Sequence, residues 1–395
     1  MILAHKIALD PNNVQETYFR KAAGTARFAY NWALGQWQQQ YDAWKTDPAL
    51  PKPSEAALRR QLNAIKGEMF PWMREVTKNA PQMAIIHLGT SFKNFFEGRA
   101  EYPTFKKKGR HDSFSLTNDQ FSIRGHRVRI PKLGWVRMHE PLRFIGRVIS
   151  GTISRIADRW YLSVTVEIPD PPGILRENQA VVGVDLGVSV LATLSTGEKV
   201  MGPKAYATAQ KHLRRLSQHF GRQMEAAKVR AGLKPGQPIP KGLHIPWSRN
   251  MQKTQQRIAR LHARIADIRA NALHQLTTDL VNRFDVIAIE DLNVAGMLKN
   301  HKLARAIADM GLSEFRRQLE YKASRNGVTV VTVNRWYPSS KTCSACDYKI
   351  PKMPLSVRAW TCPQCQTHHD RDINAAINLQ HVAESSVGSC QPVPA

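Results

Sequence analysis

Residues 181–187 read VVGVDLG, a short apolar run that ends in Asp185 between two glycines. An apolar run of this length, bounded by turn residues, is typical of a strand buried in a sheet. Burying an ionised carboxylate on such a strand costs free energy unless a positive group balances the charge, and a divalent cation is one such group. Gly183 and Gly187 lack a Cβ, so another backbone could approach this strand closely. The stretch therefore predicts a buried strand that carries a candidate metal ligand.

Two further acids stand in comparable places. Glu290 closes the apolar run VIAI at residues 286–289, and the end of a buried strand is where α/β proteins tend to build sites. Asp372 opens the run DINAA; alternatively, Asp372 or Asp370 caps the helix that follows. Taken singly, each acid could be structural. Together, Asp185, Glu290 and Asp372 predict a catalytic site for two Mg²⁺ ions, one activating water and the other stabilising the departing 3′ oxygen of a phosphodiester.

Two C-x-x-C pairs form the most specific metal-binding pattern in the chain. Residues 347–361 separate the pairs, which matches the spacing of a zinc ribbon. With four thiolates around one ion no position remains for a reactive water, so this Zn²⁺ would be structural; four free cysteines or a redox pair are the alternatives. His368 and His369 follow and are expected to be solvated or to face nucleic acid. The expected zinc ligands are Cys343, Cys346, Cys362 and Cys365.

The charge of the chain predicts a polyanionic partner. Lys and Arg number 57 and Asp and Glu 31, which gives a net charge of +26 and a pI near 10.2. Nucleic acid is the usual partner of such a chain; a membrane surface is the competitor, but no basic amphipathic anchor is present. The N-terminus has no signal-peptide core, and the few cysteines suit a reducing compartment, so we expect a cytoplasmic protein. Cys390 is left over in a polar tail.

Basic residues gather in two places. One is the loop YPTFKKKGR at residues 102–110. The other is a helix expected over about 251–282, whose apolar stripe predicts core burial and whose arginines lie off that stripe. Those arginines form a solvated face or contact phosphates. The stripe is Ile258, Leu261, Ile265, Ile268, Ala272 and Leu276; the candidate nucleic-acid contacts are Lys106, Lys107, Lys108, Arg110, Arg257, Arg260 and Arg264.

The periodicity of the sequence changes along the chain. After a short possible strand and a turn at residues 1–15, it is helical up to about residue 100. Trp32 and Trp37 in this stretch are better explained by core packing than by base stacking. Residues 160–168 alternate between apolar and polar, which indicates a half-buried strand in a hairpin. The Pro- and Gly-rich run at 169–173 is the best domain boundary, and another such run at 232–246 separates two helical segments.

These segments resemble the TnpB (OrfB) proteins of bacterial insertion sequences, which are relatives of the type V CRISPR effector nucleases. The resemblance spans nearly the whole chain. Two departures stand out: Asp347 and Gln366 occupy positions after each C-x-x-C where the family usually has glycine, and residues 232–246 look like an insertion. The most specific motifs are GVDLG at 183–187, IEDLN at 289–293, SKTCSAC at 340–346 and DRDINAAIN at 370–378.

The resemblance implies a multidomain α+β and α/β protein whose RuvC-like, RNase H-fold nuclease domain carries Asp185, Glu290 and Asp372. It also implies cleavage of double-stranded DNA next to a short motif, directed by a guide RNA. A protein-only nuclease or transposase, and an RNA-guided repressor that does not cut, are the alternatives. The implied domains are a wedge-like β-barrel at 1–15 and 101–178, a helical recognition domain at 16–100, the nuclease domain at 179–341 and 367–395, and a zinc ribbon that binds target nucleic acid at 342–366.

Overall fold

The computed structural model describes residues 1–169, 180–354 and 356–388. The chain divides into two compact units, Met1–Asp170 and Pro171–Ala395. Most of the boundary predicted at 169–173, and Cys390, lie outside the described residues. None of the helices in the described ranges is both long and apolar enough to span a lipid bilayer.

The first unit contains a seven-stranded antiparallel sheet in the order β2-β6-β7-β1-β5-β4-β3. Strand β1 pairs with β7 along most of its length and then with β5 at its end. The β6–β7 hairpin confirms the strand predicted at 160–168. The strands are β1 (Ile2–Asp10), β2 (Ser113–Thr117), β3 (Ser122–Arg124), β4 (Arg127–Ile130), β5 (Gly134–Met138), β6 (Arg147–Ile156) and β7 (Arg159–Glu167), with a 3₁₀ turn η2 (Asn118–Gln120).

The predicted wedge β-barrel is corrected to an open sheet. Strands β2 and β3 lie at opposite edges of the hydrogen-bonded order and do not pair with each other. Closure depends on the tilt and stagger of all the strands together, whereas the alternation of apolar residues indicates only that a segment is a strand.

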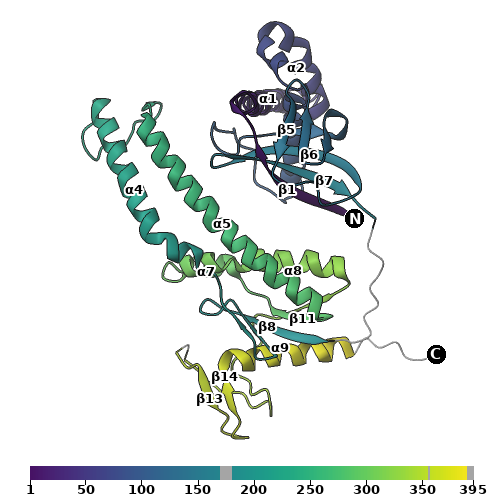
Figure 1. Cartoon of the computed structure of the whole chain (residues 1–395), viewed down its shortest axis with the longest axis vertical. Coiled ribbons are helices and arrows are strands. Elements are labelled where there is room, and N and C mark those ends of the chain that lie inside the picture. The colour runs from purple at the N-terminus through teal and green to yellow at the C-terminus, as the bar shows by residue number, and fades with distance from the viewer. Residues whose placement is uncertain (170–179, 355, 389–395) are drawn as a thin grey trace, which may run out of the picture. The chain divides into compact units, whose positions relative to one another are not determined.

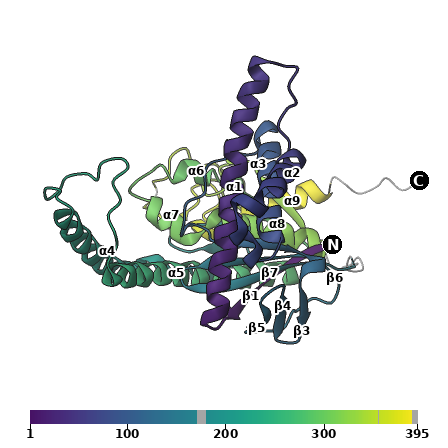
Figure 2. The same cartoon turned by 90° about the horizontal axis from the view of Figure 1, so that it is seen from above.

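Helices of the first unit pack on this sheet and on one another (Figure 2). Helix α1 begins with a capping box, in which the Asn12 side chain accepts from the Gln15 N–H and the Gln15 side chain accepts from the Asn12 N–H. Trp37 stacks on Phe92 at 4.1 Å between ring centres, which confirms core packing for that tryptophan. The helices are α1 (Asn13–Thr46), α2 (Glu55–Met69), the 3₁₀ helix η1 (Pro71–Glu75) and α3 (Asn79–Phe96).

The second unit is built on a five-stranded mixed sheet in the order β10-β9-β8-β11-β12. Strand β8 pairs antiparallel with β9 and parallel with β11, which pairs parallel with β12. The buried strands predicted at residues 181–187 and 286–290 are confirmed. The strands are β8 (Val181–Leu186), β9 (Ala192–Leu194), β10 (Lys199–Val200), β11 (Val286–Glu290) and β12 (Thr329–Val333).

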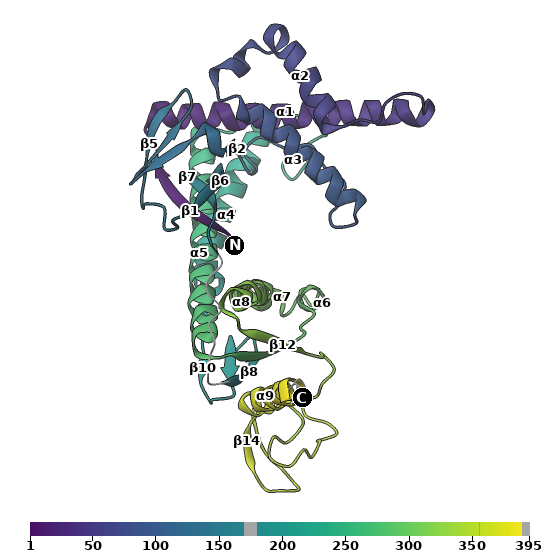
Figure 3. The same cartoon turned by 90° about the vertical axis from the view of Figure 1, so that its right-hand side faces the viewer.

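Helices cover both faces of this sheet (Figures 1 and 3). Helices α5 and α8 bury one face, and α9 buries the other. Helix α9 crosses β8 at Gly183, where an added Cβ would lie 1.8 Å from the Ala376 carbonyl oxygen. The close approach expected of this glycine is therefore present. The helices are α4 (Ala205–Arg230), α5 (Arg249–Arg283), α6 (Val294–Met297), α7 (Ala304–Met310), α8 (Leu312–Asn326) and α9 (Arg371–Gly388).

Helices α4 and α5 form a long hairpin, part of which extends beyond the sheet (Figure 1). The apolar stripe predicted for α5 is only partly core: Ile265 and Leu276 are buried, but Ile268 is 40% exposed. Leu273 and Leu280, in the C-terminal half of α5, are fully buried where the helix packs on the sheet and α8. Between these positions and the buried Met251 near the start of the helix, the apolar stripe is only partly covered, so a helical period there does not by itself produce full burial.

Candidate active site and zinc site

The three predicted acids lie on neighbouring elements of the second unit. Val184 of β8 pairs with Ile289 of β11, so the residues that follow them, Asp185 and Glu290, lie side by side near the ends of two parallel strands. Asp372 is in the first turn of α9, the helix that packs on β8. All three carboxylates are half-buried.

The three carboxylates interact electrostatically. Burial raises the pKa of Asp185 from 3.8 to about 7, and the negative charges of Glu290 and Asp372 add to this shift. The three sets of carboxylate oxygens do not all lie within 4.8 Å of one another; among the described residues only the cysteines form such a group. The acids are thus neighbours whose like charges repel. A set that offers only carboxylate oxygens, with surplus negative charge, fits a hard divalent cation such as Mg²⁺.

Glu290, Asp372 and the neighbouring Asp291 each have a side-chain partner. The Ser339 hydroxyl donates to Glu290 Oε1 at 2.5 Å, and Arg358 Nη1 lies 3.6 Å from Asp372 Oδ1. Asp291 is engaged by two arginines, Arg316 at 2.8 Å and Arg335.

The start of α9 is capped by Asp370, which resolves the alternative left open by the sequence. Its Oδ1 accepts from the N–H groups of Asp372 and Ile373, both at 3.1 Å. The other oxygen pairs with Lys199 at 2.7 Å. The Asp372 side chain is therefore not the cap.

The raised pKa of Asp185 predicts a pH-dependent stability. The protonated carboxyl is favoured in the folded state, so its contribution to stability is fully present below pH 3.8 and is lost as pH rises through 7. We expect Asp185→Asn, in zinc-loaded protein without added Mg²⁺, to raise the free energy of unfolding at pH 8 by up to roughly 4 kcal/mol. The gain should shrink toward pH 5 in urea denaturation.

Asp291→Asn is the matched control, because hydrogen bonds from Arg335 and Arg316 lower the pKa of Asp291. Its ionised form is stabilised in the folded state, so this variant should lose stability at pH 8. Equal effects of the two substitutions at all pH values would contradict the electrostatic coupling.

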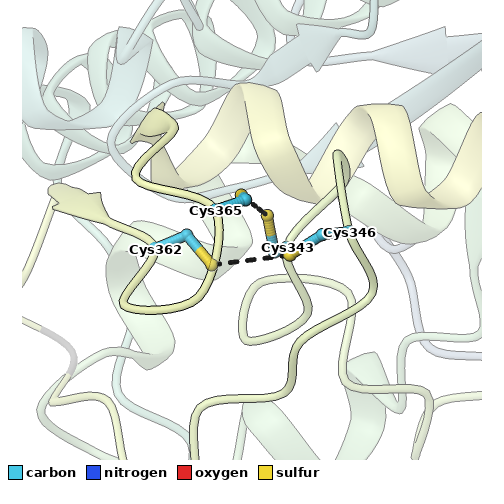
Figure 4. A group of neighbouring side chains, drawn as sticks. All are labelled: Cys343, Cys346, Cys362 and Cys365. Atoms are coloured by element: carbon cyan, nitrogen blue, oxygen red, sulfur yellow. Dashed lines mark hydrogen bonds between the residues drawn. The ribbon is translucent and has the colours of Figure 1, made fainter.

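The four predicted zinc ligands come together on two loops beside the β13–β14 hairpin, Ala359–Thr361 and His368–Asp370 (Figure 4). Cys343 Sγ lies 3.6 Å from Cys365 Sγ, and Cys346 Sγ lies 3.6 Å from Cys362 Sγ. Tetrahedral Zn–S bonds of about 2.3 Å place neighbouring sulfurs about 3.8 Å apart, so the cluster fits zinc. Four thiolates complete the coordination of one ion, which supports a structural role.

The two residues that replace glycine adopt the backbone conformation that glycine favours. Asp347 and Gln366 have φ of +59° and +62°. The Asp347 N–H donates to the Cys343 carbonyl at 2.9 Å, and the Gln366 N–H donates to the Cys362 carbonyl at 3.0 Å. Both knuckles therefore close in the same way despite the left-handed conformation, which is uncommon for Gln.

The expectation that His369 is solvated is wrong. His369 is 7% exposed, and its Nε2 lies 3.1 Å from Cys343 Sγ. Its ring also packs on Trp360 at 4.7 Å between centres. The β13–β14 hairpin turns alternate residues to opposite faces, so His369 points at the cysteine cluster while His368 is exposed.

The predicted basic loop lies in the first unit. Lys107, Lys108 and Arg110 are exposed. Lys106 is exposed as well, but its ammonium lies 3.9 Å from the centre of the Tyr30 ring, where partial desolvation lowers its pKa. Lys106 thus has a local packing role that the sequence did not indicate.

Arg257, Arg260 and Arg264 line an open cavity of about 690 Å³ on the α4–α5 hairpin. Helix α4 contributes basic residues to the same cavity, and among the described residues the lining contains no Asp or Glu. Sequence reasoning missed this second row, although its spacing of three and four residues marks one helix face. The row is His212, Arg215, His219 and Arg222.

Comparisons with known proteins agree with these features. Family models match at three places: a "Probable transposase" model at residues 163–301, a "Cas12f1-like, TNB domain" at 313–379 and a "Helix-turn-helix domain" at 1–45. Residues 1–45 form strand β1 and most of the single helix α1. The 313–379 match contains the four cysteines and Asp372.

Relatives cover nearly the whole chain. A "Putative RNA-guided DNA endonuclease" of Streptomyces pristinaespiralis is 35% identical over 383 residues, 95% of this chain and 88% of that protein. The "Putative RNA-guided DNA endonuclease InsQ" of Escherichia coli (strain K12) is 30% identical over 395 residues, 95% of this chain and 91% of that protein.

A solved structure shares the fold. In the cryo-EM structure of a Cas12f1–sgRNA–target DNA complex, one chain matches with a TM-score of 0.52 and 14% identity, over 93% of this chain and 83% of that chain. The full-length relatives, the family models and this fold lead to one conclusion: the chain belongs to the TnpB (OrfB) family of insertion-sequence proteins.

Proposed function

We propose that this protein is an RNA-guided endonuclease that cuts double-stranded DNA by hydrolysing phosphodiester bonds. The observation that carries the proposal is the electrostatic coupling of Asp185, Glu290 and Asp372 at one end of a mixed sheet. The names of the full-length relatives and the Cas12f1 fold support it.

The reaction adds water across the bond between phosphorus and the 3′ oxygen, which leaves a 3′ hydroxyl and a 5′ phosphate. Asp185, Glu290 and Asp372 would hold magnesium, which supplies positive charge against the phosphate and lowers the pKa of water. The chain's own residues surround this site: the Ser339 hydroxyl donates to Glu290, and Asp370 caps α9, so the Asp372 side chain is not used as the cap.

The basic surfaces are proposed to bind nucleic-acid phosphates. Base pairing to a guide supplies sequence specificity, so the protein needs mainly backbone contacts. The cavity on the α4–α5 hairpin presents guanidinium groups from both helices, and arginine pairs with phosphate through two parallel hydrogen bonds. Lys107, Lys108 and Arg110 of the first unit are exposed and add a second basic surface.

Neutralising the α5 arginines should change the salt dependence of binding. Each arginine that no longer neutralises a phosphate lowers the slope of log K against log salt by about 0.7 to 0.9, so three glutamine substitutions should lower it by about 2 to 3. Titration of labelled guide RNA at several salt concentrations measures the slope. The variant is Arg257→Gln, Arg260→Gln and Arg264→Gln.

The control removes the same net charge from arginines that are paired with a neighbouring carboxylate. Such pairs are exposed and add little to binding or stability. An equal decrease in slope for the test and control variants would show that net charge, rather than the cavity, binds the RNA. The control is Arg20→Gln, Arg147→Gln and Arg317→Gln, whose partners are Glu16, Glu167 and Glu314.

Sequencing the RNA that co-purifies with the protein, expressed from its own locus, tests the guided mechanism. We expect a discrete RNA with one fixed scaffold and a variable end that matches the flanking DNA. Random cellular RNA, or none, would contradict the proposal in favour of a protein-only nuclease.

A further inference from the structure

A buried serine contacts one of the three candidate catalytic acids. Ser339 is 5% exposed and follows β12, and its hydroxyl donates to Glu290 Oε1 at 2.5 Å. A hydroxyl has a single donor hydrogen, and Ser339 donates it to one carboxylate oxygen of Glu290. A short bond to an ionised acceptor is stronger than a neutral one and fixes the direction of the carboxylate plane. The second oxygen of Glu290 then keeps a defined direction for another ligand.

Two buried asparagines hold the backbone of Ser339. Asn378 Nδ2 donates to the Ser339 carbonyl at 2.7 Å, and Asn374 Nδ2 lies 3.4 Å from the same oxygen. Both side chains are 1% exposed and lie one turn apart on α9. A buried amide needs hydrogen-bond partners for its donors and its acceptor. The contacts of these two asparagines therefore fix the position of the Ser339 backbone.

The same two asparagines hold the first zinc knuckle. Each Nδ2 also donates to the Thr342 carbonyl at 2.7 Å, and Asn374 Oδ1 accepts from the Ser344 N–H at 2.9 Å. Thr342 and Ser344 flank Cys343, the fully buried member of the first C-x-x-C pair. One pair of amides therefore binds the backbone on both sides of a zinc ligand and the backbone of the serine that contacts Glu290.

We propose that Ser339 is a positioning residue for Glu290, and that Asn374 and Asn378 tie its position to the zinc knuckle at Cys343. The ribbon is then part of the nuclease site: folding of the knuckle around zinc places Ser339, and Ser339 sets the orientation of Glu290. The consequence for cleavage rests on the proposed function, whereas the consequence for divalent-metal binding does not. If the serine and the asparagines only stabilised the fold, their removal would lower stability without changing metal affinity.

Ser339→Ala tests the first link. Removing a side chain that holds a metal ligand typically costs 10- to 100-fold in metal affinity or activity, so Mn²⁺ binding to zinc-loaded protein should weaken by about that factor. Electron paramagnetic resonance measures free Mn²⁺ without any DNA, and Asp185→Asn defines the signal when the site is destroyed. Cleavage at limiting Mg²⁺ should fall in parallel and recover partly at high Mg²⁺. Mn²⁺ affinity equal to that of the unsubstituted protein would overturn the proposal.

Ser340→Ala is the matched control. Ser340 is the next residue and is half-buried, and its side chain makes no hydrogen bond within the described ranges. Mn²⁺ affinity, zinc content and melting temperature should be unchanged in this variant. If Mn²⁺ affinity fell equally in both variants, the effect would belong to the segment as a whole and not to the Ser339 hydroxyl.

A double-mutant cycle with Asn378→Ala tests the second link. If Asn378 acts on the metal site through Ser339, the double variant should bind Mn²⁺ no more weakly than Ser339→Ala alone, because the interaction is already absent. Additive decreases in affinity would show two independent effects and would overturn the link to the knuckle. Normal Mn²⁺ binding together with absence of DNA cleavage in the unsubstituted protein would instead count against the proposed function and leave the role of Ser339 standing.

Discussion

Asp185→Ala or Glu290→Ala is expected to abolish Mg²⁺-dependent DNA cleavage, a decrease of at least about 1,000-fold, because a hydrolytic site that depends on metal charge fails when its ligands are removed. Affinity for RNA and DNA should remain close to that of the unsubstituted protein. The acids repel phosphate, so their removal takes away no attraction. Single-turnover cleavage with pre-bound RNA separates the chemical step from binding.

Asp279→Ala controls for the change in charge. Asp279 is an exposed acid of α5 whose ion-pair partner is Arg283, and it carries the same charge as Asp185. This variant should cut at close to the rate of the unsubstituted protein. Persistent cutting by Asp185→Ala or Glu290→Ala would refute the assignment of the site.

Cys343→Ser is expected to release the zinc and to unfold residues 342–370. Cys343 is fully buried, and metal binding is coupled to folding in such small sites by on the order of 10 kcal/mol. Removing one of the four thiolates also leaves the zinc ion with three cysteine ligands, so its coordination shell is incomplete. His369 lies beside these ligands. Elemental analysis measures zinc, and hydrogen exchange measures protection of the ribbon backbone.

Cys390→Ser is the control for removal of a thiol, because Cys390 belongs to neither C-x-x-C pair. It should retain a full complement of zinc. A Cys343→Ser protein with unchanged zinc content would show that the cysteine cluster is not the zinc site.

Local patterns predicted the elements that carry the acids and the zinc ligands. The runs at 181–187 and 286–290 are short, apolar and bounded by turn residues, so their strand structure follows from nearby residues alone. The spacing of the four cysteines is likewise a local property, because each C-x-x-C turn places two sulfurs on one side. The prediction that three acids far apart in sequence share a site came instead from their buried surroundings, the basic charge of the chain and the family resemblance.

Features that depend on tertiary packing were missed. Neither Ser339 nor His369 has a local pattern that indicates burial, and both are buried because the first zinc knuckle packs on α9 and on the β13–β14 hairpin. The burial of α5 was overestimated at Ile268 because helical periodicity does not show where a partner helix ends. Whether the sheet of the first unit closes into a barrel depends on whether β2 pairs with β3. These two strands lie at opposite edges of the sheet, with five strands between them.

Cleavage of plasmid DNA by a complex whose RNA carries a reprogrammed guide segment tests most directly whether RNA directs the cut. The protein is zinc-loaded, Mg²⁺ is present, and the plasmids carry either the matching or a scrambled target beside a randomised flank. We predict cutting of the matching plasmid alone, with one short flank enriched, and no cutting by the Asp185→Ala complex. Cutting of both plasmids, or binding of the match without cutting by the unsubstituted complex, would contradict an RNA-guided endonuclease.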